Sequence, residues 1–548
     1  MNIPNPNTVT ENTGPSHIFI GRVITMDDDT PVAEAVAVAG NKIVAVGKRE
    51  DIEPLARTGT TGTQIIELGE KVLYPGFIEP HMHLWVTAIN YEWTDCSAFA
   101  NKTIDEVKKR LADAAAAAEP GAWVLGKLFD PSLLPGMPEL TLTELDAIIP
   151  NNPVFVFNAS MHFAYVNSVA LSRAGITADM PNPAGGSFMH DENGALNGIL
   201  SEMSAIEPVL QQIGISPEVV AQNAARITED ATRVGVTTMR EAATGALFGA
   251  QEVSMLHHMK EQGKLKTRLS LALVDEAAKT WPETAETAPG AGDEFVWIGA
   301  RKIVADGSNQ GMSGYQSQPY IGSDNRGKLD IDPNELKRRI AWCHENGWQV
   351  MIHANGDAAV ETVTNAYHEV LSQLPPRELR HRIEHCSLVN NDALFAKMKA
   401  VNVSPSFLIN HVYYWGKTLR DNILGPDRIH MLDRANAAIE AGLKTTFHSD
   451  YNVSPINPLH YVQVAVTRKM WDNGEVLAPD QCISVGQAMR AITIDAAWQL
   501  NIDEQFGSIT PGKFADFVIL GEDPQEANPD EIDKIKIAET WLGGQPIQ

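Results

Sequence analysis

The stretch that decides the fold is residues 71–84, KVLYPGFIEPHMHL. Its apolar run of β-branched and aromatic residues predicts a strand, and this strand ends in His81 and His83. Side chains two residues apart on a strand point to the same side, so the two imidazoles would converge at one strand end. Such a pair can bind a metal ion, but two ordinary polar histidines give the same pattern, and this stretch alone does not separate the two interpretations.

Composition and charge narrow the class of protein. The chain has 548 residues, 44% hydrophobic and 20% charged, so we expect a globular protein with a large core. Its net charge of -26 would repel a phosphate backbone or an anionic membrane, so we expect no nucleic-acid or membrane partner. Four scattered cysteines without a CxxC pair fit a reducing compartment. Since no secretory signal and no run of about 18 apolar residues is visible, the expected location is the cytoplasm.

The two ends of the chain share a β-like pattern. Residues 16–74 contain short apolar runs separated by Gly and Asp turns, and residues 505–548 return to this pattern. We therefore predict that both ends pair into one small β-sandwich, and that the polar residues 1–15 are disordered or frayed. Pro75 and Gly76 indicate where the chain enters the next domain.

Between these ends, helices and strands alternate. Together with the opening strand they make eight βα units, which predicts an α/β fold with a (β/α)8 TIM barrel over residues 75–504. An insertion after the first strand is predicted at about 95–205, with a capping-box helix at 103–118, a buried strand at 153–166 and a turn-rich segment at 185–201. The later strands are predicted at 236–242, 267–273, 294–307, 348–354, 381–386, 401–408 and 443–450, and helices at 216–234, 333–346, 430–442 and 484–499.

Ionisable side chains stand at the ends of five of these strands. Active sites of such barrels lie at the carboxyl ends of the strands. Taken singly, each residue has an ordinary explanation, as a lysine that reaches solvent, a half-buried histidine or a carboxylate that caps a helix. Those explanations do not account for their meeting at one end of one barrel. We therefore predict a metal site made of His81, His83, Lys302, His353, His385 and Asp450.

Longer phrases carry a family resemblance. PGFIEPHMH, ARKIVADG, MIHANGDAAV, HRIEHC and FHSDYNV contain these residues, and GSITPGKFADFVIL lies near the end of the chain. Together they resemble the amidohydrolase superfamily, and HFAYVNSVAL, GALNGILSE and RHRIEHC are similar to its YtcJ-like branch, amidohydrolase family 3, which includes N-substituted formamide deformylases. The chain departs from the pattern at Glu79, where aspartate is usual, and at His448, where glycine is usual.

The resemblance implies a metal pair, with zinc as the expected metal. His81, His83 and Asp450 would hold one ion, and His353 and His385 the other. Lys302, carboxylated by carbon dioxide, would bridge them, since a carbamate offers an oxygen ligand where an ammonium would repel cations. A site with one ion and an unmodified lysine is the alternative.

The reaction that this implies is hydrolysis of a non-peptide C–N bond, of amide or formamide type, in a small apolar or aromatic substrate. Metal-activated hydroxide would attack, and Asp450 would act as general acid and base. The same site would also suit an ester, carbamate or lactone hydrolase or a deaminase, and a catalytically inactive binding protein is a more remote alternative. The sequence contains no GxxxxGK[ST] and no GxSxG motif.

Substrate contacts are predicted at the barrel mouth and in the insertion. The segment HVYYWG at 411–416 follows the seventh strand, and aromatic side chains with polar tips suit such a substrate. Asp357 and Arg382 are expected to be structural, at a helix start and in an ion pair. Oligomeric state is unreadable, and a homodimer is only the common default. The predicted substrate-binding residues are His162, Glu202, Asn410, His411, Tyr413, Tyr414 and Trp415.

Overall fold

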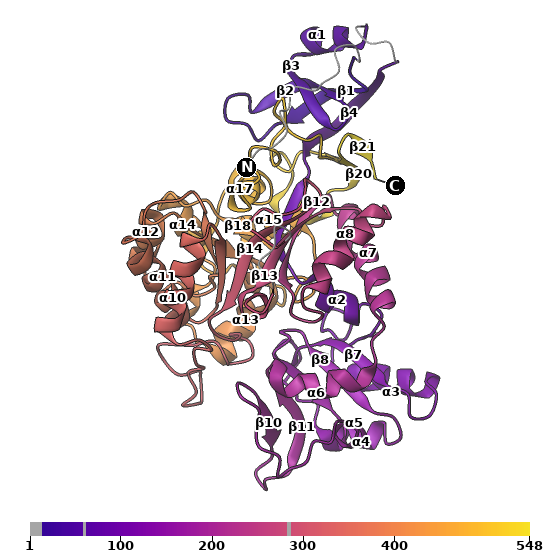
Figure 1. Ribbon diagram of the computed structural model, residues 1–548, viewed down its shortest axis with the longest axis vertical. Coiled ribbons are helices and arrows are strands. Elements are labelled where there is room, and N and C mark those ends of the chain that lie inside the picture. The colour runs from indigo at the N-terminus through magenta and orange to yellow at the C-terminus, as the bar shows by residue number, and fades with distance from the viewer. Residues whose placement is uncertain (1–13, 58–61, 282–286, 548) are drawn as a thin grey trace.

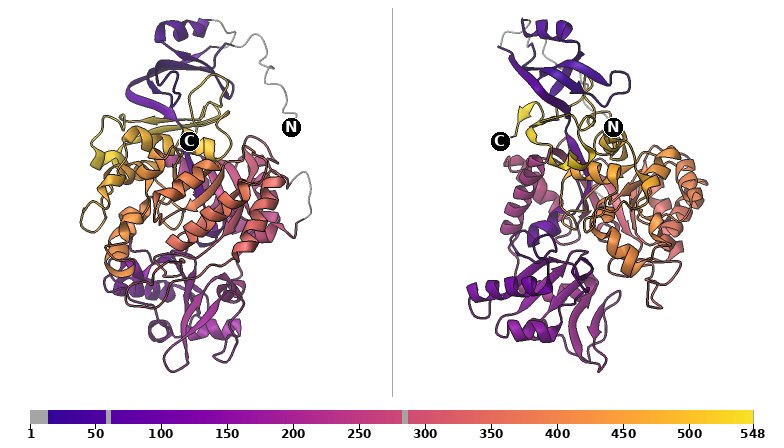
Figure 2. Two further views of the ribbon diagram at one scale, coloured as in Figure 1. Left: turned by 90° about the vertical axis from the view of Figure 1, so that its left-hand side faces the viewer. Right: turned by 180° about the vertical axis from the view of Figure 1, so that it is seen from behind.

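The protein has three tiers along its long axis (Figure 1). The computed structural model describes residues 14–57, 62–281 and 287–547, so the segment 1–15, predicted to be frayed, lies almost wholly outside the described residues. An outer β-sheet occupies one end, a barrel the middle, and an inserted region the other end, and two further views show the same order (Figure 2).

The middle tier is a barrel of eight parallel strands, each paired with the next in chain order. Strands buried on both faces have nearly continuous apolar sequences, as in LSLALV at 269–274. The last strand is shorter than the predicted 443–450, and Tyr451 beyond it closes the sheet by accepting a 2.8 Å hydrogen bond from the backbone N–H of His83. The strands are β5 (Phe77–Met82), β12 (Val236–Thr244), β13 (Arg268–Val274), β14 (Val296–Val304), β15 (Gln349–Ala354), β16 (His381–His385), β17 (Val403–Phe407) and β18 (Thr446–Phe447).

Helices pack around the barrel with their apolar faces inward. In α7 the buried residues Val220, Ala224, Ile227 and Ala231 recur at helical spacing. The predicted helix 484–499 is two helices, because Thr493 between them leaves the helical backbone conformation. The helices of this tier are α2 (Leu84–Asn90), α7 (Pro217–Arg233), α8 (Gln251–Glu261), α9 (Asp275–Ala278), α10 (Pro333–Glu345), α11 (Asp357–Leu371), α12 (Asp392–Ala400), α13 (Gly416–Thr418), α14 (Ala435–Glu440), α15 (Pro458–Thr467), α16 (Val485–Ala491) and α17 (Ile494–Gln499).

The outer tier is a seven-stranded sheet that combines both ends of the chain, in the order β21-β20-β19-β4-β1-β2-β3. The sheet curves over its own core, since the ring of Phe19 on β1 meets Phe517 and Trp541 at centroid distances of 5.4 and 4.9 Å. The elements are β1 (His17–Ile24), β2 (Val32–Ala39), β3 (Lys42–Gly47), α1 (Arg49–Ile52), β4 (Gln64–Pro75), β19 (Phe517–Leu520), β20 (Ile537–Leu542) and β21 (Gln545–Pro546).

The inserted tier lies between β5 and β12 in sequence and has a six-stranded sheet, in the order β10-β11-β9-β8-β7-β6. Figures 1 and 2 place it at the end of the barrel opposite the outer sheet. Its strands are β6 (Thr94–Asp95), β7 (Val124–Phe129), β8 (Val154–Asn158), β9 (Phe163–Val166), β10 (Ser187–His190) and β11 (Leu196–Ser201), and its helices are α3 (Ile104–Ala117), α4 (Leu142–Ile148), α5 (Ser168–Ala174) and α6 (Met203–Ile213).

Three details of the insertion differ from the prediction. The single strand predicted at 153–166 is a hairpin, because Asn158 accepts a 2.8 Å hydrogen bond from the backbone N–H of Ser160 and turns the chain. The turn-rich segment 185–201 is also a hairpin, in which the buried Phe188 pairs with Leu200. The capping box at 103–118 is half formed, since the Glu106 carboxylate accepts from the backbone N–H of Lys102.

The predicted fold class is confirmed: an α/β chain with a (β/α)8 barrel, an outer β layer built from both chain ends, and an insertion after the first barrel strand. Among the described residues, no helix has the length and apolar character that crossing a membrane requires. All four cysteines are free.

Candidate metal centre

The carboxyl ends of the barrel strands face a cavity of about 480 Å3 that the inserted tier also lines. Ten of its 25 lining residues are apolar, among them Met161, Met203 and Val274, and the other fifteen are polar or charged. His81 is fully buried and contacts the cavity wall through Asp450. The polar lining residues that the sequence predicted are His83, Lys302, His353, His385 and Asp450 from the barrel, His411 from the loop after β17, and His162 and Glu202 from the insertion.

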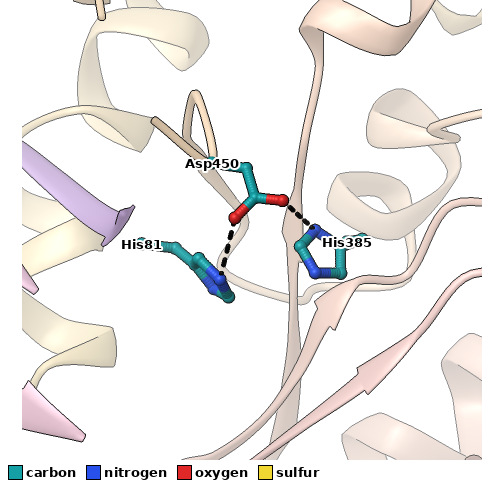
Figure 3. A group of neighbouring side chains, drawn as sticks. All are labelled: His81, His385 and Asp450. Atoms are coloured by element: carbon teal, nitrogen blue, oxygen red, sulfur yellow. Dashed lines mark ion pairs between the residues drawn. The ribbon is translucent and has the colours of Figure 1, made fainter. Parts of the chain in front are cut away.

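The Asp450 carboxylate lies among three histidines, two from the end of the first strand and one from the end of the sixth. Its Oδ1 is 3.2 Å from Nε2 of His81 and 3.1 Å from Nε2 of His83. Its Oδ2 is 3.9 Å from Nδ1 of His385, and Figure 3 shows the two oxygens facing these two different imidazoles, His81 and His385. The structure therefore brings the ends of the first, sixth and eighth strands together at one carboxylate.

His81 is held in one orientation by a buried ion pair. Its Nδ1 contacts the Glu384 carboxylate, which Arg382 binds through two hydrogen bonds of 2.7 and 2.8 Å. Burial alone would raise the pKa of Glu384, but Arg382 and the hydrogen bond with His81 hold it well below its usual range. A carboxylate at Nδ1 fixes the tautomer and leaves the Nε2 lone pair free toward Asp450. Arg382 is thus in an ion pair, as predicted.

Lys302 stands beside this cluster, and no carboxylate among the described residues is in hydrogen-bonding contact with it. Its Nζ is 3.4 Å from Nε2 of His81, and its side chain is only slightly exposed. Burial lowers the pKa of Lys302 below its ordinary value, although Glu384 and Asp450 oppose this. The environment therefore favours the neutral amine more than water does.

His353 completes the group on the side of the fifth strand. Its Nε2 donates to the carbonyl of Gly307 at 3.0 Å, which leaves Nδ1 as the atom with a free lone pair. Its ring centroid is 4.6 Å from that of His385. Burial lowers the pKa of His353 well below its usual range, so the ring is neutral, as a metal ligand must be.

The turn that carries Asp450 is hydrogen-bonded to the first strand. Glu79 accepts hydrogen bonds from the backbone N–H of Ser449 at 3.1 Å and from the Tyr461 hydroxyl at 2.7 Å. Burial raises the pKa of Glu79 to about 8. Asp450 and His385 both have left-handed backbone, with φ of 54° and 62°, a conformation that is uncommon for non-glycine residues. Glu79 is one of the two departures from the family pattern, and it holds this turn.

The donor atoms fit a metal ion. Nδ1 of His385 and Oδ1 of Asp450 are buried and lack a hydrogen-bond partner among the described residues. Two ligands at about 2.1 Å from a tetrahedral ion lie roughly 3.4 Å apart, and the donor atoms of His81, His385 and Asp450 all lie within 4.8 Å of one another. Imidazole nitrogen with carboxylate oxygen is a donor set that suits Zn2+.

A second grouping, of His81, Glu384 and His448, has similar spacing but a different role. The Glu384 carboxylate is already bound by Arg382, and His448 stacks on His81 at a centroid distance of 4.7 Å. These residues support His81. The role of Glu384 was not predicted from the sequence. The sequence does contain a signal for it, because Arg382 and Glu384 are opposite charges two residues apart on a buried strand.

The aromatic segment after β17 packs against both the insertion and the barrel. Trp415 is fully buried and donates from Nε1 to Asp130 at 2.8 Å, and Tyr414 contacts the ring of Trp471. Tyr413 packs against His460. In the part of the chain that the structure describes, these three aromatic residues and Asn410 are not among those that line the cavity. Their contact with substrate stays a prediction, as does that of His411, His162 and Glu202, which do line it.

Comparison with known proteins agrees with this geometry. The family model described as "Amidohydrolase family" matches residues 64–548. The chain belongs to the amidohydrolase family. It is 29% identical to YtcJ of Bacillus subtilis (strain 168) over 96% of this chain and 98% of that protein, and 26% identical to the N-substituted formamide deformylase of Arthrobacter pascens over 96% and 97%. The crystal structure of an uncharacterized metal-dependent hydrolase from Pyrococcus horikoshii OT3 has a TM-score of 0.74, at 22% identity, over 94% of this chain and 99% of that one.

These findings confirm the predicted family and the predicted enzyme class, an amidohydrolase. The family match covers the barrel, the insertion and the outer-sheet strands β4, β19, β20 and β21 together. The similar crystal structure supports the fold alone. The family match and the cluster of imidazole and carboxylate donors are separate observations, and both fit a metal-dependent hydrolase.

Proposed function

We propose that this amidohydrolase cleaves an amide or formamide C–N bond in a small, largely apolar substrate. The observation that carries the proposal is the Asp450 carboxylate, which faces three imidazoles at the wall of a 480 Å3 cavity. A cavity of this size suits a substrate of drug-like size. The similarity to an N-substituted formamide deformylase supports the type of bond.

His81, His83 and Asp450 would hold one zinc ion, and His353 and His385 a second. A carboxylated Lys302 between them fits a buried amine whose pKa is lowered, because carbon dioxide reacts with the neutral amine. Bound zinc would lower the pKa of a water molecule toward about 7 and polarise a carbonyl group. A crystal structure whose density shows a bare amine on Lys302 would exclude the bridge and leave the one-ion alternative.

Asp450 is the residue proposed to move the proton. Burial alone would raise the pKa of Asp450, but His385 and His81 hold it well below its usual range, so it is ionised and can accept the proton of the attacking water. The same carboxylate would return the proton to the leaving nitrogen. His81, held by Glu384, keeps Asp450 in place. The apolar side chains of Met161, Met203 and Val274 would bind the hydrocarbon part of the substrate.

The experiment is to compare wild type with Asp450→Asn on N-formyl and N-acyl aryl and alkyl amines, with metal content measured in parallel. We expect the rate to fall by about 10²–10⁴-fold while the fold is retained. Asp113→Asn, at an exposed position on α3, is the matched control and should keep wild-type turnover. Near-normal turnover by Asp450→Asn would refute the role of Asp450.

Esters, carbamates and lactones present the same carbonyl to the same site, so they form the second arm of the panel. If wild type hydrolyses these and none of the amides, the C–N assignment is wrong and the site is that of an esterase or lactonase. If metal-loaded protein hydrolyses nothing and binds members of the panel unchanged, the chain is a binding protein.

A further inference from the structure

One pair of side chains on the cavity wall comes from outside the barrel. His162 and Glu202 lie in the insertion, and Nδ1 of His162 is 2.9 Å from the Glu202 carboxylate. The barrel ligands described above do not include either residue. Their position on the wall of the cavity at the carboxyl ends of the strands therefore needs its own explanation.

The pair is fixed by the backbone as well as by the side chains. The backbone N–H of Glu202 donates to the carbonyl of His162 at 2.7 Å. His162 follows the turn between β8 and β9, where Asn158 and Ser160 are hydrogen-bonded to each other, and the Ser160 hydroxyl accepts from the backbone N–H of His162 at 3.3 Å. Glu202 has φ 66° and ψ 154°, a backbone conformation that side chains rarely adopt. The imidazole is thus presented in one orientation.

One nitrogen of His162 remains available to a molecule in the cavity. Because Nδ1 is used by Glu202, Nε2 is the remaining polar atom of a residue that lines the cavity. Burial alone would lower the pKa of His162, but the hydrogen bond and charge of Glu202 raise it above its ordinary value. Because a carboxylate only accepts hydrogen bonds, Nδ1 carries the hydrogen toward Glu202, and the negative charge behind the ring stabilises the doubly protonated form, in which Nε2 is also a donor.

The His162 ring lies close to His353, one of the proposed metal ligands. The ring centroids of His162 and His353 are 6.2 Å apart. Both residues line the same cavity, so a molecule bound beside His353 would also lie next to the His162 ring. In acyl transfer the atom on which negative charge develops is the carbonyl oxygen, and donors aimed at it contribute most to catalysis.

We propose that His162, oriented by Glu202, is a catalytic residue that donates a hydrogen bond from Nε2 to the scissile carbonyl oxygen as negative charge develops there. This rests on the proposed acyl hydrolysis and adds a donor from the insertion to it. No bond to His162 forms or breaks, and no proton leaves it. The donor acts on the acyl part of the substrate, so its effect is independent of whether the leaving group is an amine or an alcohol.

The test compares His162→Gln and Glu202→Gln with wild type on acetanilide and phenyl acetate, which share acyl group and ring. We expect His162→Gln to lower kcat by about 10²–10³-fold on both substrates with little change in KM, and Glu202→Gln to lower kcat on both by a smaller factor. His190→Gln, an exposed histidine on β10 of the same tier, is the matched control and should keep wild-type rates. A loss on the amide alone would overturn the proposal in favour of proton donation to the leaving nitrogen, and wild-type rates on both would overturn it outright.

A binding measurement separates this inference from the proposed function. Phenyl methylphosphonate carries a tetrahedral anionic centre in place of the acyl carbon, and its affinity is measured by calorimetry on metal-loaded protein. We expect His162→Gln to weaken its binding by a factor similar to the loss in kcat, with metal content unchanged. Equal binding to wild type and variant would overturn the inference, even if wild type hydrolyses neither substrate and the proposed function itself fails. If His162→Gln does not fold, Glu202→Gln carries the same comparison.

Discussion

Replacing Glu384 with glutamine should weaken both the folded state and the metal site. Glu384 and Arg382 are fully buried, and the substitution leaves the Arg382 guanidinium without its carboxylate. Removing one partner of a buried ion pair typically costs about 3–5 kcal/mol. Since Arg382 keeps hydrogen bonds to the Pro80 carbonyl at 3.2 Å and the Ser406 hydroxyl at 3.0 Å, we expect about 3 kcal/mol, at the lower end of that range. Loss of the carboxylate behind His81 should lower metal affinity by about 10–100-fold.

Two measurements separate these effects. Denaturant unfolding of metal-free protein reports the stability, and titration with Zn2+ reports the affinity. The double variant Arg382→Met with Glu384→Gln removes both charges, so it should regain most of the stability but none of the affinity. Because the pKa of Glu384 is lowered, its contribution is present above its unfolded pKa of about 4.3 and constant between pH 6 and 8. Glu261→Gln is an exposed control. Wild-type metal affinity in Glu384→Gln would refute the role of Glu384 in orienting His81.

Three further predictions concern packing and pH. Trp415→Phe removes the hydrogen bond to the buried Asp130 and should lower the free energy of unfolding by about 1.5–3 kcal/mol in denaturant titration; an unchanged midpoint would show that this contact does not anchor the insertion. Gly76→Ala would place a Cβ 2.3 Å from Oγ1 of Thr237, so the thermal midpoint should fall and partly recover when Thr237→Ala is added; no fall would mean that the junction is not tightly packed. Burial raises the pKa of Glu252 to about 7, so its stabilising contribution is complete below about pH 4.3 and lost as pH rises through about 7; Glu252→Gln should flatten the stability profile across that window, and an equal slope in both proteins would contradict this.

The meeting of these side chains in one cavity could be predicted because strand ends are local features with a fixed consequence. His81 and His83 share one side of a strand end, and the parallel order of a barrel brings Lys302, His353 and His385 to the same edge. This prediction did not require knowing which pairs of side chains are in contact. The boundaries of the eighth strand were less predictable, because closure depends on Tyr451 meeting β5, which is a long-range contact.

Side-chain partners far apart in sequence could not be predicted. Glu384 lies against His81 only because the first and sixth strands face each other across the barrel. The position of His162 depends on a turn at 159–162. The sequence did not reveal this turn, because the apolar residues on both sides of it look like one continuous strand at 153–166. Trp415 resembles a substrate contact in sequence, but its indole N–H binds a buried carboxylate of the insertion. Residue types and strand ends were enough to propose which side chains meet. The partners that orient each side chain became visible only in the folded structure.

The central claim is that separate strand ends bind metal together in one cavity. Anomalous diffraction from crystals of Zn2+-supplemented protein, recorded at the zinc absorption edge, tests it most directly. We expect a peak in contact with His81, His83 and Asp450, and a second beside His353 and His385 if Lys302 bridges two ions. Fully occupied zinc elsewhere on the protein, with no peak among these side chains, would contradict the account.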